Sequence, residues 1–174
     1  VDNVEDVQES QEKAQEEFKD ALTKIKELYT FDGGDLEIFY DKLKDSYDDC
    51  DSRAGQIEKR IDDVEQVAGD LFMEWETEIT QINDAKLKNS SKKSLRDSKI
   101  KYQKLETIMN QSTKGMYPVL TKLKDYVLYL KHNLNAKAVG SLGGEIVSIE
   151  KDVERLIKDM NLSIKEAEHF INNF

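Results

Sequence analysis

The residues that could bind a metal or act in catalysis are few, and none forms a complete site. Glu166 and His169 have the Glu-x-x-His spacing of a di-iron helical bundle. Such a site needs a second copy of this motif and two further inward-facing glutamates. The other histidine, His132, has Tyr129 three residues before it instead of a glutamate. A solvated helix end is therefore the favoured interpretation of Glu166 and His169.

Other stretches with suggestive composition also lack the residues that their chemistry requires. Gly33-Gly34 and the glycines of 140–144 match no phosphate-binding motif and follow no predicted strand. Asp48, Asp49 and Asp51 resemble part of a calcium loop but lack its glycine and its closing glutamate. We therefore predict no catalytic residue, no metal ligand and no cofactor, and we expect the protein not to be an enzyme.

A basic block is the strongest candidate for a binding surface. Residues 85–104 carry eight basic side chains and one acidic one, Asp97, in a chain whose net charge is −10. Such a cluster attracts an anionic lipid surface, an acidic protein or DNA. The alternative is a solvated, lysine-rich turn, and the lack of interleaved aromatics argues against stacking on single-stranded nucleic acid. The residues proposed to contact an anionic partner are Lys86, Lys88, Lys92, Lys93, Arg96 and Lys99.

Composition indicates long helices around narrow apolar seams. Charged residues make up 36% of the 174 residues, and the chain has eight glycines and one proline. With so few chain breakers the elements must be long. No apolar run reaches the roughly 20 residues of a transmembrane helix. The chain begins with Val1, which is typical of a processed or trimmed product, and a leader or lipid anchor would then be missing from it.

Apolar residues recur at alternating steps of three and four residues, which is the pattern of helices in coiled coils. Four such seams predict helices at roughly 1–30, 35–86, 92–134 and 139–173 within one domain, 1–174. The first reversal is predicted at Phe31–Gly34, with Asp35 as the N-cap of the second helix. The second reversal falls within 83–94 and is placed near Asn89.

Three single residues carry further predictions. Cys50 lies in the second seam, where we expect a small buried hydrophobe rather than a reactive thiol. Trp75 is predicted to be buried against the third helix. Pro118 lies within the third helix, where the loss of one hydrogen bond predicts a kink near residues 114–118, with a complete break as the alternative.

The predicted fold is all-α: an elongated, antiparallel four-helix bundle or coiled coil. Because the second and third helices are longer than the other two, residues 70–108 are expected to project as a hairpin with the basic block at its tip. Residues 1–84 carry a net charge of −17. The tip is expected to lie far from the acidic helices, so attraction to them would not explain its position. The seams can be satisfied within one chain or between copies, so a monomer and a homo-oligomer both fit.

Residues 31–37, Phe-Asp-Gly-Gly-Asp-Leu-Glu, and residues 128–139, Leu-Tyr-Leu-Lys-His-Asn-Leu-Asn-Ala-Lys-Ala-Val, are distinctive stretches. They resemble a family of bacterial proteins with a domain of unknown function, typical of Gram-negative gammaproteobacteria. The resemblance extends over the whole chain, including Val1–Val7. In that family the mature segment usually follows a lipoprotein-type signal. The resemblance therefore implies a periplasmic or membrane-anchored location on the envelope, and it implies no activity.

These observations lead to one functional prediction and one alternative. The first is a non-enzymatic helical interaction or spacer protein of the bacterial cell envelope, with an unknown protein or an anionic membrane as its partner. The alternative is a cytoplasmic coiled-coil module that binds a protein or nucleic acid through the basic hairpin tip. No strong signal for nucleic-acid binding accompanies either.

Overall fold

A computed structural model describes residues 1–29 and 35–173, without the side chains of residues 28, 29 and 136. All regular structure in these residues is helical, which confirms the all-α prediction. The helices are α1 (Asp2–Tyr29), α2 (Leu36–Gln81), α3 (Ala85–His132), α4 (Ala136–Ser141) and α5 (Gly143–Asn173). The predicted first turn, Phe31–Gly34, lies outside the described residues.

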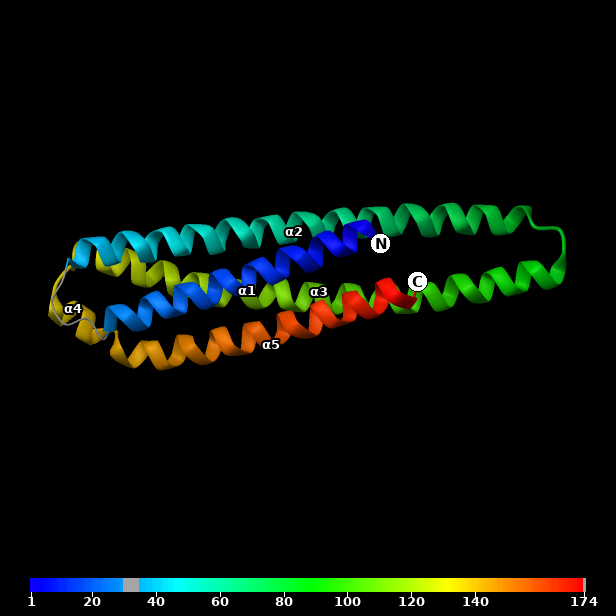
Figure 1. The fold of residues 1–174 in the computed structure, drawn as a ribbon. Coiled ribbons are helices and arrows are strands. Elements are labelled where there is room, and N and C mark those ends of the chain that lie inside the picture. Colours follow the sequence, from blue (N-terminus) through cyan, green and yellow to red (C-terminus); the bar gives the residue numbers. More distant parts are fainter. Residues whose placement is uncertain (30–34, 174) are drawn as a thin grey trace.

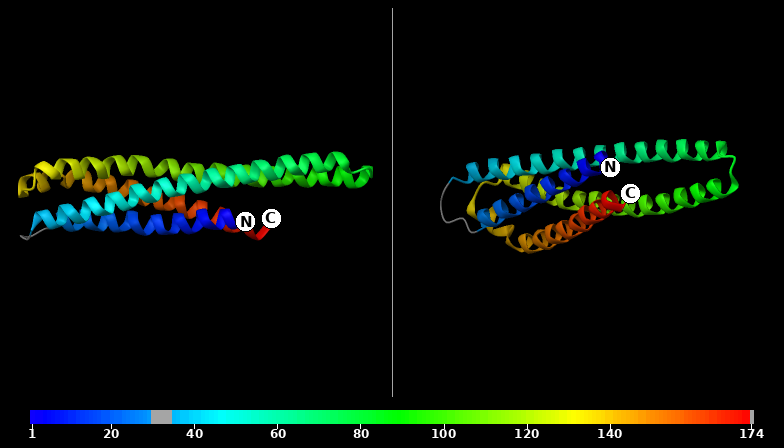
Figure 2. Two further views of the ribbon diagram at one scale, coloured as in Figure 1. Left: turned by 90° about the horizontal axis from the view of Figure 1, so that it is seen from above. Right: turned by 45° about the vertical axis from the view of Figure 1, so that its right-hand side comes forward.

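Four of the helices pack as an elongated bundle (Figure 1). Each of α1, α2, α3 and α5 packs against two others, in the cyclic order α1–α2–α3–α5. With 46 and 48 residues, α2 and α3 are each about 70 Å long at ~1.5 Å per residue. They extend well past the ends of α1 and α5, and the two chain ends lie at the root of this extension in all views (Figures 1 and 2). We call residues 70–108 the hairpin and the rest of the described chain the four-helix body.

The tip of the hairpin is a three-residue reversal, and its predicted position was wrong. It lies at Ile82–Asp84, before the predicted site near Asn89. Asp84 is the N-cap of α3, and its carboxylate accepts a hydrogen bond from the backbone N–H of Leu87 at 2.8 Å. This cap starts α3 seven residues earlier than predicted, so Asn89 lies inside the helix. At the other end of α2, Asp35 accepts from Glu37 N at 2.9 Å, as predicted for an N-cap.

Two helix interruptions also differ from the sequence-based expectations. Pro118 lies within α3, which continues to His132, so a complete break there is wrong and the kink stays a prediction. The fourth predicted helix, in contrast, is divided at Leu142 into the short α4 and the long α5. The short helix begins earlier than predicted, because Asn135 caps it by accepting from Ala138 N at 2.9 Å.

The core follows the predicted seams in α1, α3 and α5. The seam residues whose side chains the structure describes in these three helices are buried, including Phe18, Leu105 and Ile149, each 0% exposed. A buried polar pair joins α1 to α3 within this core: Gln11 Nε2 donates to Ser112 Oγ at 2.8 Å. Because each seam position faces the centre of the body, the side-chain pattern specifies how the helices pair.

The seam of α2 departs from the prediction where the body ends and the hairpin begins. Strict alternation predicts Ala68, Leu71 and Trp75 on the core face, but Leu71 is 42% exposed and Phe72 is 8% exposed. The core-facing positions therefore advance by two successive steps of four, from buried Val64 through partly buried Ala68 to buried Phe72. Such a four-residue insertion, called a stutter, locally unwinds a coiled coil.

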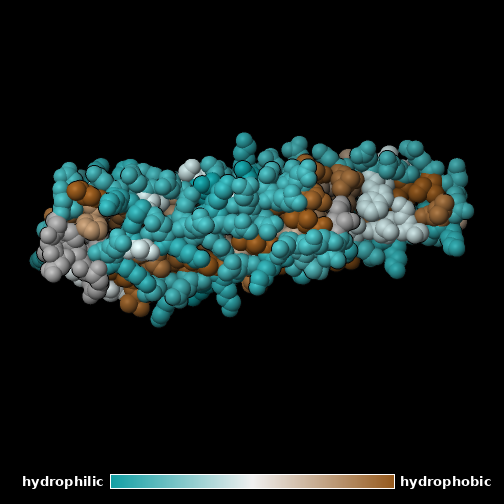
Figure 3. All heavy atoms as spheres, viewed as in Figure 1, coloured by the Kyte–Doolittle hydropathy of each residue, from teal (hydrophilic) through white to brown (hydrophobic). Residues whose placement is uncertain are grey.

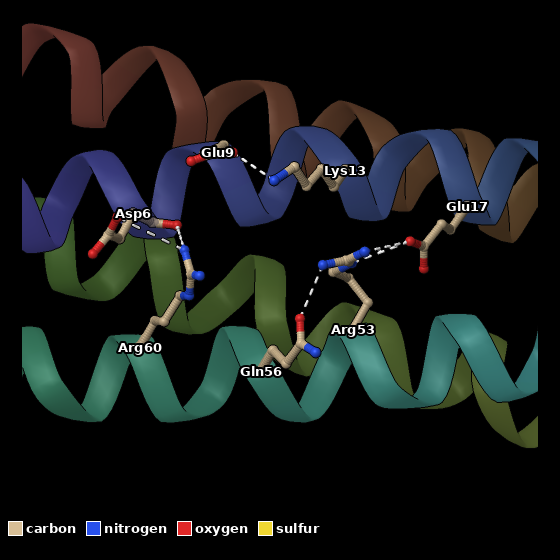
Figure 4. Close-up of polar contacts among 7 residues, drawn as sticks. All are labelled: Asp6, Glu9, Lys13, Glu17, Arg53, Gln56 and Arg60. Carbon is tan, nitrogen blue, oxygen red and sulfur yellow. Dashed lines mark hydrogen bonds and ion pairs between the residues drawn. The ribbon is translucent and has the colours of Figure 1, made fainter.

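Ion pairs join α1 to α2 along the body (Figure 4). Arg53 donates from Nε and Nη2 to the same Glu17 oxygen at 3.1 and 2.7 Å, and from Nη1 to Gln56 at 2.9 Å. About two turns further along α2, Arg60 Nη1 donates to the backbone carbonyl of Asp6 at 2.6 Å. The acidic α1 is therefore held by the cations on one side of α2.

Candidate interaction surface on the hairpin

The hairpin has a small core of its own that holds α2 and α3 together. Phe72 and Tyr102 meet edge to face with ring centroids 5.8 Å apart, and Ile79 is 4% exposed. Trp75 is only half-buried, so its predicted burial is confirmed in part. Its indole Nε1 donates to Ser91 Oγ of α3 at 2.9 Å. These contacts fix the relative positions of the side chains on the hairpin surface.

Three of the six proposed contact residues form a row. Lys88, Lys92 and Arg96 are spaced four residues apart on α3, and they line a groove of about 360 Å³ between α2 and α3. Ile79 and Leu95 lie at the base of this groove. Both are nearly buried, so the groove combines an apolar floor with a cationic wall. We call this the basic groove.

Two of the six residues are bound within the hairpin. Lys99 forms an ion pair with Glu76 of α2, and its Nζ lies 5.7 Å from the centre of the Phe72 ring. Lys88 Nζ donates to the backbone carbonyl of Thr80 at 3.2 Å. Both interactions tie α3 to α2, so these residues also stabilise the hairpin.

The remaining two residues, Lys86 and Lys93, lie on another side of α3. They precede Lys104 by 18 and 11 residues, which correspond to five and about three turns, so all three share one direction. Lys104 Nζ pairs with Glu166 of α5 at 2.7 Å. Lys86 and Lys93 therefore occupy the α5 side of α3 beyond the end of α5. The structure thus divides the six residues between two sides of the hairpin.

Local acidic residues offset the basic block, contrary to the expectation that the tip lies far from acidic helices. The hairpin part of α2 contains Asp70, Glu74, Glu76 and Glu78, and the net charge of residues 70–108 is +1. The four-helix body, residues 1–69 and 109–174, carries −11. Even so, no ion pair within the described residues involves Lys86, Lys92, Lys93 or Arg96. These four cations are available to a partner.

A second groove follows the basic groove toward the body and has the opposite charge. It measures about 420 Å³ and is lined by α2 and α3 residues that include Glu65, Glu76 and Glu106. Glu65 accepts a hydrogen bond from Asn110 Nδ2 at 3.0 Å. Burial, and next the charge of Glu65, raise the pKa of the Glu106 carboxyl. The sequence analysis missed this acidic groove, because its residues are far apart in the chain and unremarkable singly.

A third hollow lies at the root of the hairpin and is apolar. It measures about 270 Å³ and is lined by residues of α1, α2, α3 and α5, among them Val67, Leu71 and Phe170. On the face shown in Figure 3, brown and pale surface gathers over the hairpin and its root, whereas the body is mostly teal. The hollow forms because α1 and α5 end there while the seam of α2 and α3 continues.

Two of the other residues considered from the sequence, Glu166 and Cys50, are explained by an ion pair and by burial. Glu166 pairs with Lys104, as above, and His169 follows it on the same helix. In residues 1–29 and 35–173, no group of three or more His, Cys, Asp and Glu side chains is arranged to hold a metal ion. Cys50 is 0% exposed, and burial raises the pKa of its thiol to about 12. The prediction of a small buried hydrophobe at Cys50 is therefore confirmed.

None of the described helices contains a stretch long and apolar enough to cross a bilayer. No curated protein and no solved structure matches the chain. A family described as a protein of unknown function does match, and the match covers residues 1–174. The chain belongs to this family, DUF2959.

Proposed function

We propose that this chain is a non-enzymatic interaction and spacer protein of the bacterial cell envelope, whose hairpin tip binds an anionic surface. The observation that carries the proposal is the row of Lys88, Lys92 and Arg96 on the hairpin, with Lys86 and Lys93 nearby. An anionic membrane is the partner that fits best, because it attracts cations on more than one side of the tip.

Electrostatics would also orient the molecule. Each lysine or arginine near an anionic membrane contributes about 1 kcal/mol of attraction, and this falls off within ~10 Å at 0.1 M salt. The body carries −11 and is repelled by the same surface. The protein would therefore bind by its tip and hold the far end of the body about 70 Å, the length of α2, from the membrane.

The envelope location rests on a different kind of support. It comes from the resemblance of residues 31–37 and 128–139 to envelope lipoprotein-type proteins. Cell fractionation, together with the mass of the protein isolated from membranes, tests it: acyl chains on the native protein are the expected result. Recovery of unmodified protein with the cytoplasmic fraction would support the cytoplasmic coiled-coil module instead.

Membrane binding by the tip is tested by reversing its free cations. We expect a variant with Lys86, Lys92, Lys93 and Arg96 replaced by Glu to lose about 100-fold or more of its affinity for anionic vesicles at low salt. Cosedimentation with phosphatidylglycerol vesicles and with neutral phosphatidylcholine vesicles measures the effect. Binding of the unchanged protein should weaken as salt is raised.

The matched control reverses four exposed cations of the body, which gives the same net charge. These are Lys59, Lys114, Lys124 and Lys137. If the control loses as much affinity as the tip variant, net charge and not the tip decides binding. If the unchanged protein binds neither kind of vesicle at low salt, the proposed membrane contact is wrong.

A further inference from the structure

The basic and acidic grooves form one continuous surface. Both are lined only by residues of α2 and α3, and both include Glu76. Neither α1 nor α5 contributes to this surface, so the body does not obstruct it. We call it the outer face of the hairpin; at its inner end it continues onto Glu65 and Gly69, which belong to the body. Its half near the tip carries the basic row, and its half near the body carries Glu65 and Glu106.

Lys92 and Lys88 lie on the tip side of Lys99, and each has an acidic or polar counterpart at the same distance on the body side. Lys92 and Glu106 lie seven residues to either side of Lys99 on α3. Lys88 and Asn110 lie eleven residues to either side, and Asn110 holds Glu65 through the hydrogen bond described above. Lys92 is thus matched by the carboxylate of Glu106 on α3, and Lys88 by the carboxylate of Glu65 beside Asn110, whereas Arg96 is matched by the uncharged Tyr102.

A surface of this kind is complementary to itself when it is turned end over end. A two-fold axis through the level of Lys99 would place Lys92 of one copy opposite Glu106 of the other. The same rotation brings Lys88 opposite Glu65. Two-fold contacts between identical surfaces are the commonest way in which proteins form dimers.

We propose that the outer face of the hairpin binds a second copy of this chain in antiparallel orientation, with the two-fold axis at Lys99 and Glu76. The two bodies then point away from each other. At the centre, Met73 is 67% exposed in the single chain and would be covered by the second copy. Gly69, which also lines the acidic groove, has nothing within 4 Å of where a side chain would begin, so it leaves room for close approach.

The size of the surface suits a reversible dimer. From Lys88 to Asn110 the face is about 33 Å long, and two helices side by side are about 20 Å wide. The contact would bury about 1,300 Å² in total, which is near the lower end of the ~1,200–2,000 Å² typical of stable complexes. Because the pairing is largely ionic, we expect a dimer that weakens with dilution and with salt.

The proposed dimer goes beyond the proposed membrane contact and competes with it in part. Lys88, Lys92 and Arg96 serve both surfaces, whereas Lys86 and Lys93 lie on another side of α3. An acidic protein is the other macromolecule that would fit the basic groove alone. It would leave the acidic groove unused, which is why the observations favour a second copy.

Charge exchange at one pair tests the dimer. We expect sedimentation velocity at low salt to show a concentration-dependent dimer for the unchanged chain. Lys92→Glu and Glu106→Lys should each weaken it at least tenfold, because each brings like charges together. The double variant Lys92→Glu/Glu106→Lys should restore it to within about threefold. Circular dichroism checks that each variant keeps its helices.

A cysteine on the axis tests the geometry separately. Lys99→Cys places a thiol where the two copies meet, so oxidation should give a covalent dimer, while Ser90→Cys, on the side of α3 away from Glu76, should not. Cys50 is buried and does not compete. A chain that stays monomeric at low salt at all concentrations, or a double variant that stays as weak as the singles, would overturn the proposal.

The vesicle assay separates failure of the dimer from failure of the membrane contact. Glu106→Lys keeps every cation of the tip, so it should weaken the dimer without loss of vesicle binding. The double charge-exchange variant should recover the dimer but not the contribution of Lys92 to vesicle binding. A chain that dimerises but ignores anionic vesicles would contradict only the proposed function.

Discussion

Replacing Phe18 with alanine is expected to lower the free energy of unfolding by about 3–5 kcal/mol. Phe18 is 0% exposed and lies in the seam of α1, which packs against both α2 and α5. The change removes a large buried apolar surface and leaves a cavity that helices of this length cannot close without moving along their whole contact. Urea unfolding followed by circular dichroism measures the loss.

The control for Phe18→Ala is Lys19→Ala, which truncates an exposed side chain at the next position of α1. It should change the free energy of unfolding by no more than about 0.5 kcal/mol. A loss below about 1 kcal/mol for Phe18→Ala would contradict the packing of α1 described here. The same result would mean that packing of α1 contributes little to the stability of the body.

Replacing Pro118 with alanine is expected to raise the free energy of unfolding by about 2 kcal/mol or more. Pro118 is exposed and lies inside α3, so alanine removes no buried contact there. It supplies the N–H that proline lacks, and this group can donate to the carbonyl of Lys114 one turn earlier. Part of the gain is offset, because proline also restricts the unfolded chain.

Gly55→Ala provides the calibration for this gain. Gly55 lies inside α2, and nothing is within 4 Å of the position that its Cβ would take. Alanine there should add about 0.5–1 kcal/mol through helix propensity alone. If Pro118→Ala gives no more than Gly55→Ala, the helix has already compensated for the missing hydrogen bond. A loss of stability would show that proline is required at this position.

The seams show how much of the fold follows from periodicity. Steps of three and four residues identify the core face of α1, α3 and α5, because burial of one helical face demands this spacing. In α2 the pattern is ambiguous at Leu71 and Phe72, since both are apolar and adjacent. Only the contact of Phe72 with Tyr102, across the hairpin, decides which of them faces inward.

The reversal at the tip was misplaced because two weak local signals competed. Asn89 and its serine neighbours favour turns, but they also tolerate a helix that is already capped. Asp84 supplies that cap through Leu87 N. The dipeptide Asn83-Asp84 is the local signal for this cap, but it lies within a longer polar stretch that contains other turn-forming residues.

The basic block was recognised from composition, but its arrangement was not. The sequence shows eight cations within the 20 residues 85–104, whereas a helix turns about 100° per residue and separates neighbours such as Lys92 and Lys93. The side chains that face these cations and their neighbours come from α2, which brings Glu76 to Lys99 and places Glu65 near Asn110. These pairings depend on the register of the hairpin, which local sequence does not determine.

The buried position of Cys50 makes its rate of alkylation a measure of how often the body opens. It is the chain's single thiol, and its closed surroundings and raised pKa keep it from reacting while α2 stays packed. An alkylating reagent can therefore modify it only during the moments when the body opens. The rate of that modification would time these openings in the unaltered protein, and because the hairpin contains no cysteine, it would time those of the body alone.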